Sequence, residues 1–146
     1  MRVSELLSQF EFLTRDYLTA SKVQLRIEAC DDVVDVDAQK MLRVLQNLVN
    51  NAAEVLQEEG GMIHVGATRR DSKVEIRVSD NGPGIPEDLR GRIFDPFVTY
   101  GKEKGLGLGL AIAKSFVEAH GGSIELAPEA KTGTTFLIRL PWVAEQ

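Results

Sequence analysis

Residues 80–110 read DNGPGIPEDLRGRIFDPFVTYGKEKGLGLGL, with a glycine cluster at each end. Glycine has no Cβ, so it lets the backbone take a positive φ angle and approach a ligand closely. The second cluster runs directly into residues 110–119, whose apolar spacing predicts a helix. Because the first turn of a helix presents unpaired N–H groups and a partial positive charge, this arrangement suits the binding of phosphate.

Asp80 follows a strand-like run at residues 74–78 and stands beside the first glycine cluster. A carboxylate fixed there can accept hydrogen bonds from an amino group, such as that of a purine. Either glycine cluster alone is as typical of a turn or of close packing as of a binding site. Together, and with the asparagine-rich helix described below, they predict a nucleotide site with the base at one end and the phosphates at the other.

The length of 146 residues predicts a single domain, residues 1–146, that buries a core without disulfides or metals. A net charge of −5 gives no general basic surface, so we expect no nucleic-acid partner. Cys30 is the sole cysteine and is predicted to be a small apolar residue, and His64 and His120 show no zinc spacing. No apolar run has the length of a membrane span and no signal-peptide pattern is present, which predicts a cytoplasmic domain without direct membrane contact. A membrane-anchored parent protein stays compatible with this prediction. The isolated domain is expected to be monomeric.

Apolar periodicity divides the chain into helices and strands. Helices are predicted at residues 3–17 (within a leading segment 1–20), 38–57 and 108–120, with a short one at 85–93. Strands are predicted at residues 23–27, 33–36, 62–67, 73–79, 123–126 and 134–140. We therefore predict an α+β fold, a two-layer α/β sandwich in which a mixed sheet of about five strands is covered on one face by three main helices.

Local signals predict where several of these elements begin and end. Ser4 and Asp37 are candidate N-caps of the first two helices. The glycine pairs at 60–61 and 121–122 should end the second and third main helices. Pro141 should end the last strand, because proline has no N–H to donate to a ladder.

The second main helix contains LQNLVNNAAEVL at residues 45–56. Asn47, Asn51 and Glu54 fall at i, i+4 and i+7, on one face beside the apolar stripe, so they should be partly covered. Asparagine is unfavourable inside a helix, so each one needs a partner. One interpretation is that both asparagines hydrogen-bond other backbone groups. The other is that Asn51 offers its carbonyl oxygen to Mg²⁺, which prefers hard oxygen ligands and keeps several waters.

The chain resembles the catalytic, ATP-binding domain (HATPase_c) of the histidine kinases of two-component signalling. That domain belongs to the GHKL superfamily, shared with gyrase, a heat-shock chaperone and mismatch-repair ATPases. The resemblance rests on five motifs in the family's order: NLVNNAAE at 47–54, DNGPGI at 80–85, FDPF at 94–97, GLGLGL at 105–110 and GTTF at 133–136. It covers nearly all of the chain, from about residue 23 to residue 140, and so implies the GHKL fold.

The resemblance implies an adenine site at the first glycine cluster. Asp80 would accept the adenine amino group, with help from Thr134. Gly82 and Gly84 would let the base approach the backbone, with Ile85 next to them.

The resemblance also implies a site for Mg²⁺ and the phosphates. Asn51 would hold the metal, and Asn47 would lie close to the metal and the phosphates. The backbone that cradles the phosphates would comprise Gly105, Leu106, Gly107, Leu108 and Gly109.

A mobile ATP lid is implied at about residues 94–105. Phe94 and Phe97 would anchor it, with Phe97 also against the nucleotide. Lys102 or Lys104 on the lid would reach the γ-phosphate, and the competing interpretation of each lysine is a solvated surface charge.

The activity implied by the resemblance is transfer of the γ-phosphoryl group of Mg-ATP to a histidine, leaving ADP. The acceptor would lie on a separate helical hairpin domain of the same parent protein, with a response regulator downstream. Asn47 stands where the ATP-hydrolysing relatives have a water-activating glutamate, and asparagine cannot act as that base. This argues for transfer rather than hydrolysis.

Two features depart from the family pattern. Glu54 stands where many members carry a phosphate-binding lysine or arginine, so we assign it no phosphate contact. The chain begins with one helix and shows no acceptor hairpin, and His120, at a helix end, is expected to cap that helix. A stand-alone anti-sigma-type serine kinase and a non-catalytic nucleotide-binding module of the same fold stay open as alternatives.

Overall fold

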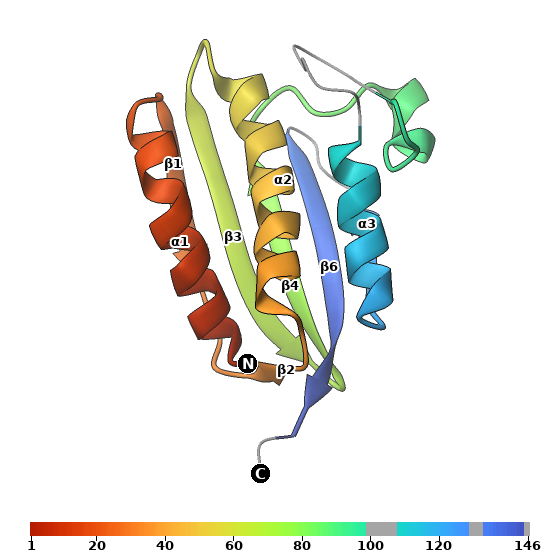
Figure 1. Cartoon of the computed structure of the whole chain (residues 1–146). Helices are drawn as coiled ribbons and strands as arrows, with labels where there is room; N and C mark the ends of the chain where they lie inside the picture. Colours follow the sequence, from red (N-terminus) through yellow and green to blue (C-terminus); the bar gives the residue numbers. More distant parts are fainter. Residues whose placement is uncertain (99–107, 129–132, 145–146) are drawn as a thin grey trace.

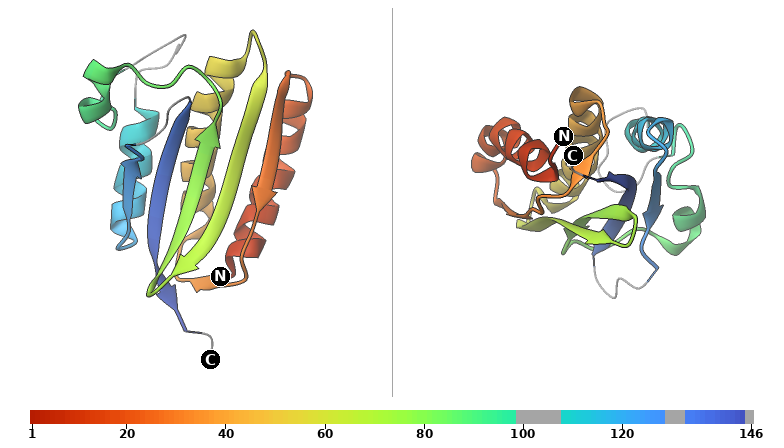
Figure 2. Two further views of the ribbon diagram at one scale, coloured as in Figure 1. Left: turned by 180° about the vertical axis from the view of Figure 1, so that it is seen from behind. Right: turned by 90° about the horizontal axis from the view of Figure 1, so that it is seen from below.

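The structure is a computed structural model that describes residues 1–98, 108–128 and 133–144. The elements in chain order are α1 (Val3–Thr19), β1 (Val23–Glu28), β2 (Val33–Val34), α2 (Ala38–Leu56), β3 (Gly61–Arg70), β4 (Lys73–Asp80), η1 (Glu87–Arg92), α3 (Gly109–Ala119), β5 (Ser123–Leu126) and β6 (Thr134–Val143). The predicted short helix is a 3-10 helix, η1. Figures 1 and 2 show α1, α2 and α3 on one face of the sheet, which confirms the predicted two-layer sandwich.

The sheet is mixed, as predicted, but it has six strands rather than about five. Its order is β1–β3–β4–β6–β2, and β5 also pairs with β6. Among the described strands, β1 and β3 run parallel and all other pairs are antiparallel. The end of β4 therefore lies beside the beginning of β6.

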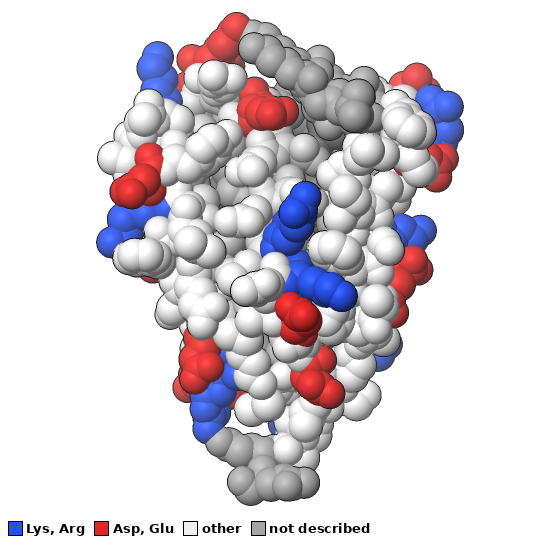
Figure 3. Space-filling view, viewed as in Figure 1, with Lys and Arg blue, Asp and Glu red and all other residues white. Residues whose placement is uncertain are grey.

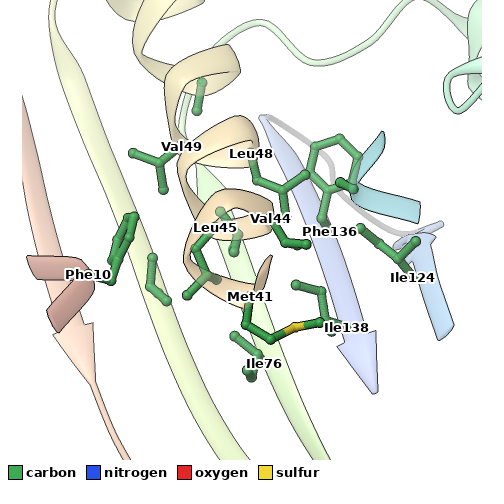
Figure 4. Packing of buried hydrophobic residues seen from close by; sticks show 14 of the residues in the cluster. Phe10, Met41, Val44, Leu45, Leu48, Val49, Ile76, Ile124, Phe136 and Ile138 are labelled. Carbon is green, nitrogen blue, oxygen red and sulfur yellow. The ribbon is translucent and has the colours of Figure 1, made fainter. Parts of the chain in front are cut away.

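The helix α2 occupies the middle of the helical layer and follows its prediction closely. Its buried side chains are Met41, Val44, Leu45, Leu48, Val49, Ala52, Ala53 and Leu56. Figure 4 shows this apolar face turned toward the sheet, with Met41 pointing to Ile76 and Ile138. Burying each methionine, valine or leucine side chain of this face contributes roughly 1.5–3 kcal/mol, so this face is the main reason that α2 docks here.

Both predicted ends of α2 are confirmed. The side chain of Asp37 accepts the N–H of Lys40 at 3.1 Å, as an N-cap does. Gly60 has a φ of +80° and donates its N–H to the carbonyl oxygen of Leu56 at 2.7 Å. Glycine adopts this left-handed conformation without a steric cost, so the helix ends there.

The helix α1 differs from its prediction in its cap and in its buried face. Its N-cap residue is Arg2 rather than Ser4, and its side chain makes no capping hydrogen bond. The apolar spacing in the sequence predicted a face formed by Val3, Leu6, Leu7, Phe10, Leu13 and Tyr17. The buried face instead continues through Thr14 and Leu18, and Leu13 is 52% exposed. Apolar residues that face a helix partner can follow one another at intervals of three or four residues. In α1, which contacts both α2 and β1, the buried residues after Phe10 follow at intervals of four.

The last strand, β6, runs to Val143, so the prediction that Pro141 ends it is wrong. Proline lacks only its own N–H, and the residue after it can still pair. The backbone N–H of Trp142 donates to the carbonyl oxygen of Ser72 at 2.9 Å, and Trp142 pairs with Val34 of β2. These partners are distant in sequence, so the local proline signal could not reveal the extension.

Charged side chains occur on both faces of the molecule. On the helical face, acidic and basic groups are interspersed among uncharged atoms (Figure 3). On the opposite face, Glu75 forms ion pairs with Arg77 at 3.1 Å and with Arg139 at 3.4 Å. Within the described parts of the chain, no helix combines the length and the apolar character that crossing a bilayer requires.

Candidate functional site

Several segments that are far apart in the sequence meet at one end of the sandwich. Asp80, the last residue of β4, pairs with Ile63 of β3 and with Thr134 of β6. At the same end, Asn47 of α2 donates from Nδ2 to the carbonyl oxygen of Gly109, the first residue of α3, at 3.0 Å. Figure 1 shows the ends of α2 and β4 and the beginnings of α3 and β6 at the top of the molecule.

Asp80 is a half-buried carboxylate at the end of the sheet. The N–H of Gly82 donates to its Oδ1 at 2.9 Å. Removal from water raises the pKa of Asp80 above its ordinary 3.8, while hydrogen bonds from the backbone N–H groups of Gly82 and Thr134 act in the opposite direction. A hydrogen-bond acceptor held in this way is suited to bind an amino group.

The raised pKa of Asp80 predicts a pH-dependent stability. The folded protein binds this proton more tightly than the unfolded chain, so protonated Asp80 favours folding at low pH and that contribution is lost as the pH rises through the raised pKa. We therefore expect Asp80→Asn to be more stable than the wild type at pH 7, with a difference that shrinks toward pH 4. Urea unfolding at both pH values measures this. A variant that is less stable at pH 7 would contradict the expectation.

The turn after Asp80 has room only for glycine at two positions. A Cβ on Gly82 would lie 3.0 Å from Oδ1 of Asp80 and 3.2 Å from Cδ2 of Leu56. Gly84 has a φ of +84°, and a Cβ there would lie 3.0 Å from the carbonyl oxygen of Gly133. A side chain at Gly82 would therefore press against the Asp80 carboxylate. Ile85, next in the chain, is buried.

A cavity of about 460 Å³ opens beside this turn. It is lined by Glu54, Val55, Leu56, Glu58, Glu59, Gly60, Asn81, Gly82 and Pro83. Its α2 side carries three glutamates, whose charge disfavours phosphate. This agrees with the expectation that Glu54 makes no phosphate contact.

Of the three asparagines of α2, Asn47 and Asn51 are the candidate site residues, and they have different surroundings. Both are half-buried, as predicted. The hydrogen bond from Asn47 to Gly109 is the backbone bond that one interpretation expected. The side chain of Asn51 has no hydrogen-bond partner among the residues that the structure describes, so its amide oxygen can bind a ligand. An amide oxygen on a half-covered face fits Mg²⁺, which takes oxygen ligands and keeps several waters.

The second glycine cluster and the lid are described only in part. Lys102, Lys104, Gly105, Leu106 and Gly107 lie outside the described residues. Leu108 is the N-cap residue of α3 and Gly109 begins the helix, so the helix starts where the sequence predicted.

The two phenylalanines of FDPF have different positions. Phe94 packs edge-to-face on Phe136, with ring centroids 5.9 Å apart. Phe97 is 72% exposed and has a φ of +69°. Phe94 is therefore packed against the sheet and Phe97 is not, and the roles of both as lid anchors stay predictions. A positive φ is unusual for a bulky residue such as Phe97.

The histidines and the cysteine lie outside this site. His120 contacts the carbonyl oxygen of Phe116 through Nδ1 at 2.7 Å and accepts the N–H of Asp37 through Nε2 at 3.1 Å. Both ring nitrogens are thus occupied at the end of α3, which confirms the predicted capping role. Partial burial raises the pKa of the Cys30 thiol, which makes it a poor nucleophile.

Comparison with known proteins identifies similar chains. The model of the family described as histidine kinase-, DNA gyrase B- and HSP90-like ATPase matches residues 36–144. The chain is 41% identical over 125 residues to the alginate biosynthesis sensor protein KinB of Pseudomonas aeruginosa, a match that covers 84% of this chain and 21% of KinB. The chain therefore spans about a fifth of the length of this curated relative.

Solved structures show the same fold. The catalytic domain of histidine kinase ThkA has a TM-score of 0.85 and 31% identity, covering 97% of this chain and 93% of that one. Histidine kinase ThkA in complex with the response regulator protein TrrA has a TM-score of 0.81 and 30% identity, covering 98% of this chain and 41% of that one. These similarities confirm the predicted fold.

Proposed function

Because the chain belongs to the histidine kinase-, DNA gyrase B- and HSP90-like ATPase family, we propose that it is the catalytic part of a sensor histidine kinase, donating the γ-phosphoryl group of ATP to a histidine on another domain. The observation that carries the proposal is the meeting of Asp80, its glycine turn and the asparagines of α2 at one end of the sandwich. Since the chain spans about a fifth of KinB, the acceptor histidine is sought elsewhere in the parent protein.

Recognition of adenine is assigned to Asp80. Its carboxylate accepts the amino group of adenine, and guanine has no amino group at that position. Gly82 has no side chain that would press against the carboxylate, and Gly84 lets the turn take a positive φ beside Gly133. Thr134, buried beside Asp80 in the sheet, supports the same contact.

The metal and the phosphates are assigned to the N-terminal side of α3. Asn51 holds Mg²⁺ through its amide oxygen, and bound Mg²⁺ supplies neutralisation of phosphate charge. Asn47 connects α2 to the first residue of α3 and so fixes the phosphate-binding end of α3 relative to Asn51. The segment with Lys102 and residues 105–107 is assigned to the γ-phosphate from its sequence alone.

Transfer, rather than hydrolysis, follows from the side chains at this end. Hydrolysis needs a base that activates water, and Asn47 cannot act as one. Its Nδ2 is also engaged with Gly109. His120 is engaged at the far end of α3, so it does not serve as the phosphoryl acceptor.

The partners follow from this assignment. The acceptor is a histidine on a helical hairpin of the parent protein, and a response regulator receives the phosphoryl group next. The similarity to ThkA, which was solved in complex with a response regulator, supports the second partner. We place the domain on the cytoplasmic side, where ATP is available, whether or not its parent is membrane-anchored.

The rate of ATP turnover by the isolated chain tests the proposal. We expect tight binding of Mg-ATP in a calorimetric titration, together with hydrolysis slower than about one turnover per minute, well below the usual range for enzymes. Turnover of several ATP molecules per second without a partner would indicate an ATPase instead. No binding of ATP at millimolar concentration would contradict the proposal that the chain is an ATP-dependent kinase domain.

A further inference from the structure

The strand pairing of β3 and β4 continues one residue beyond Asp80 in an unusual form. The register pairs Ile63 with Asp80, which places Met62 opposite Asn81. The N–H of Asn81 donates to the carbonyl oxygen of Met62 at 3.3 Å. The return bond comes from the side chain, because the N–H of Met62 donates to Oδ1 of Asn81 at 2.8 Å.

In an ordinary antiparallel pair, both residues exchange backbone N–H and carbonyl groups. Here the Asn81 amide oxygen takes the place of its own backbone carbonyl. Asparagine can imitate a backbone acceptor in this way, and it does so most often at turns. The backbone after Asn81 is therefore free to leave the strand at once, while the pairing with β3 still holds the residue that follows Asp80.

Glycines on both sides make this contact possible. A Cβ on Gly61 would lie 2.6 Å from Oδ1 of Asn81 and 2.8 Å from Cδ2 of Leu56. Any side chain at Gly61 would therefore displace the Asn81 amide. On the other side, a Cβ on Gly133 would collide with the carbonyl oxygen of Asp80. The backbone at residues 80–81 is thus enclosed between two positions that have no side chain.

We propose that Asn81 is a positioning residue for base recognition: its bond to Met62, permitted by Gly61, fixes the backbone from which the Asp80 carboxylate points. This inference rests on the proposed function, in which Asp80 reads the adenine amino group. Asn81 acts through Asp80. Loss of the Asn81 side chain should therefore lower the affinity for ATP, whose adenine amino group Asp80 binds, and have little effect on the affinity for GTP.

The test compares the affinities of ATP and GTP by calorimetry. Asn81→Ala should lower the affinity for ATP roughly three- to tenfold, as expected from one hydrogen bond, and leave the affinity for GTP nearly unchanged. Asn81→Asp keeps an acceptor of the same shape and should retain the preference for ATP. Gly61→Ala does not change the Asn81 residue, but the added methyl group displaces its side-chain amide. This variant should therefore reproduce the effect of Asn81→Ala.

A double-mutant cycle separates positioning from general damage. In an Asp80→Asn background, Asn81→Ala should cost almost nothing further in ATP affinity. Equal losses for ATP and GTP, or a full additional loss in that background, would overturn the proposal. If Asn81→Ala does not fold, Gly61→Ala carries the same comparison. A wild type without preference for ATP would overturn the base assignment of the proposed function itself, and the positioning role with it.

Discussion

Replacing Asn51 by alanine is expected to abolish the Mg²⁺ dependence of ATP binding and to stop phosphoryl transfer, while the domain stays folded. Asn51 is half-buried beside the apolar face of α2, and its side chain has no hydrogen-bond partner among the described residues. Removing the amide oxygen takes away the proposed ligand to the metal and leaves no buried group unpaired. We expect the affinity for Mg-ATP to fall at least about tenfold, which corresponds to about 1.4 kcal/mol.

Calorimetric titration of ATP with and without Mg²⁺ measures this effect. Asn50→Ala is the matched control, because Asn50 is the adjacent residue of the same helix and is exposed. The control should keep the Mg²⁺ dependence of the wild type. If Asn51→Ala also keeps it, Asn51 has a structural role only and the metal must be placed elsewhere.

Replacing Asp80 by asparagine is expected to weaken ATP binding by about 1–3 kcal/mol, the usual loss when one partner of a buried polar contact is removed. Asparagine has nearly the same shape, so the turn at Gly82 is preserved and the change concerns charge and acceptor strength. Because a hydrogen bond to a charged acceptor is stronger than one to a neutral acceptor, the amino group of adenine is held less tightly.

The affinities of ATP and GTP for the same variant provide the measurement. The preference for ATP should disappear in Asp80→Asn, through weaker ATP binding rather than stronger GTP binding. Asp71→Asn is a suitable control, since Asp71 lies in the hairpin turn at the opposite end of β4 and asparagine tolerates its φ of +56°. An unchanged ATP affinity in Asp80→Asn would remove Asp80 from the base site.

Features governed by neighbouring residues could be predicted from the sequence. The cap at Asp37 and the end of α2 at Gly60 depend on local hydrogen bonds and on one positive φ angle. The burial of α2 follows from the width of its apolar stripe. Features set by distant partners could not be predicted, such as the continuation of β6 beyond Pro141, which depends on Ser72 and β2.

In the candidate site, too, the sequence indicated local motifs but not contacts between distant segments. The motifs identified Asp80, Asn51 and the glycines around them as binding residues, and these assignments stay predictions. From the sequence, no role in positioning Asp80 was assigned to Asn81, Gly61 or Gly133. Their roles depend on which residue of β3 faces β4 and on how closely β6 approaches, and only the folded register shows this. A glycine pair before a strand and a glycine before Thr134 were the available signals, and both are also typical of ordinary turns.

Radiolabelled ATP, given to the chain alone and then to the chain mixed with the histidine-bearing hairpin of its parent protein, tests the central claim most directly. Positioning and charge neutralisation dominate phosphoryl transfer, and the chain is proposed to supply both for the donor only. We predict no stable label on the chain alone, and label on the hairpin that is lost in acid and retained in base, as phosphohistidine requires. Rapid hydrolysis without the hairpin, or an acid-stable phosphoserine on a partner, would contradict the account.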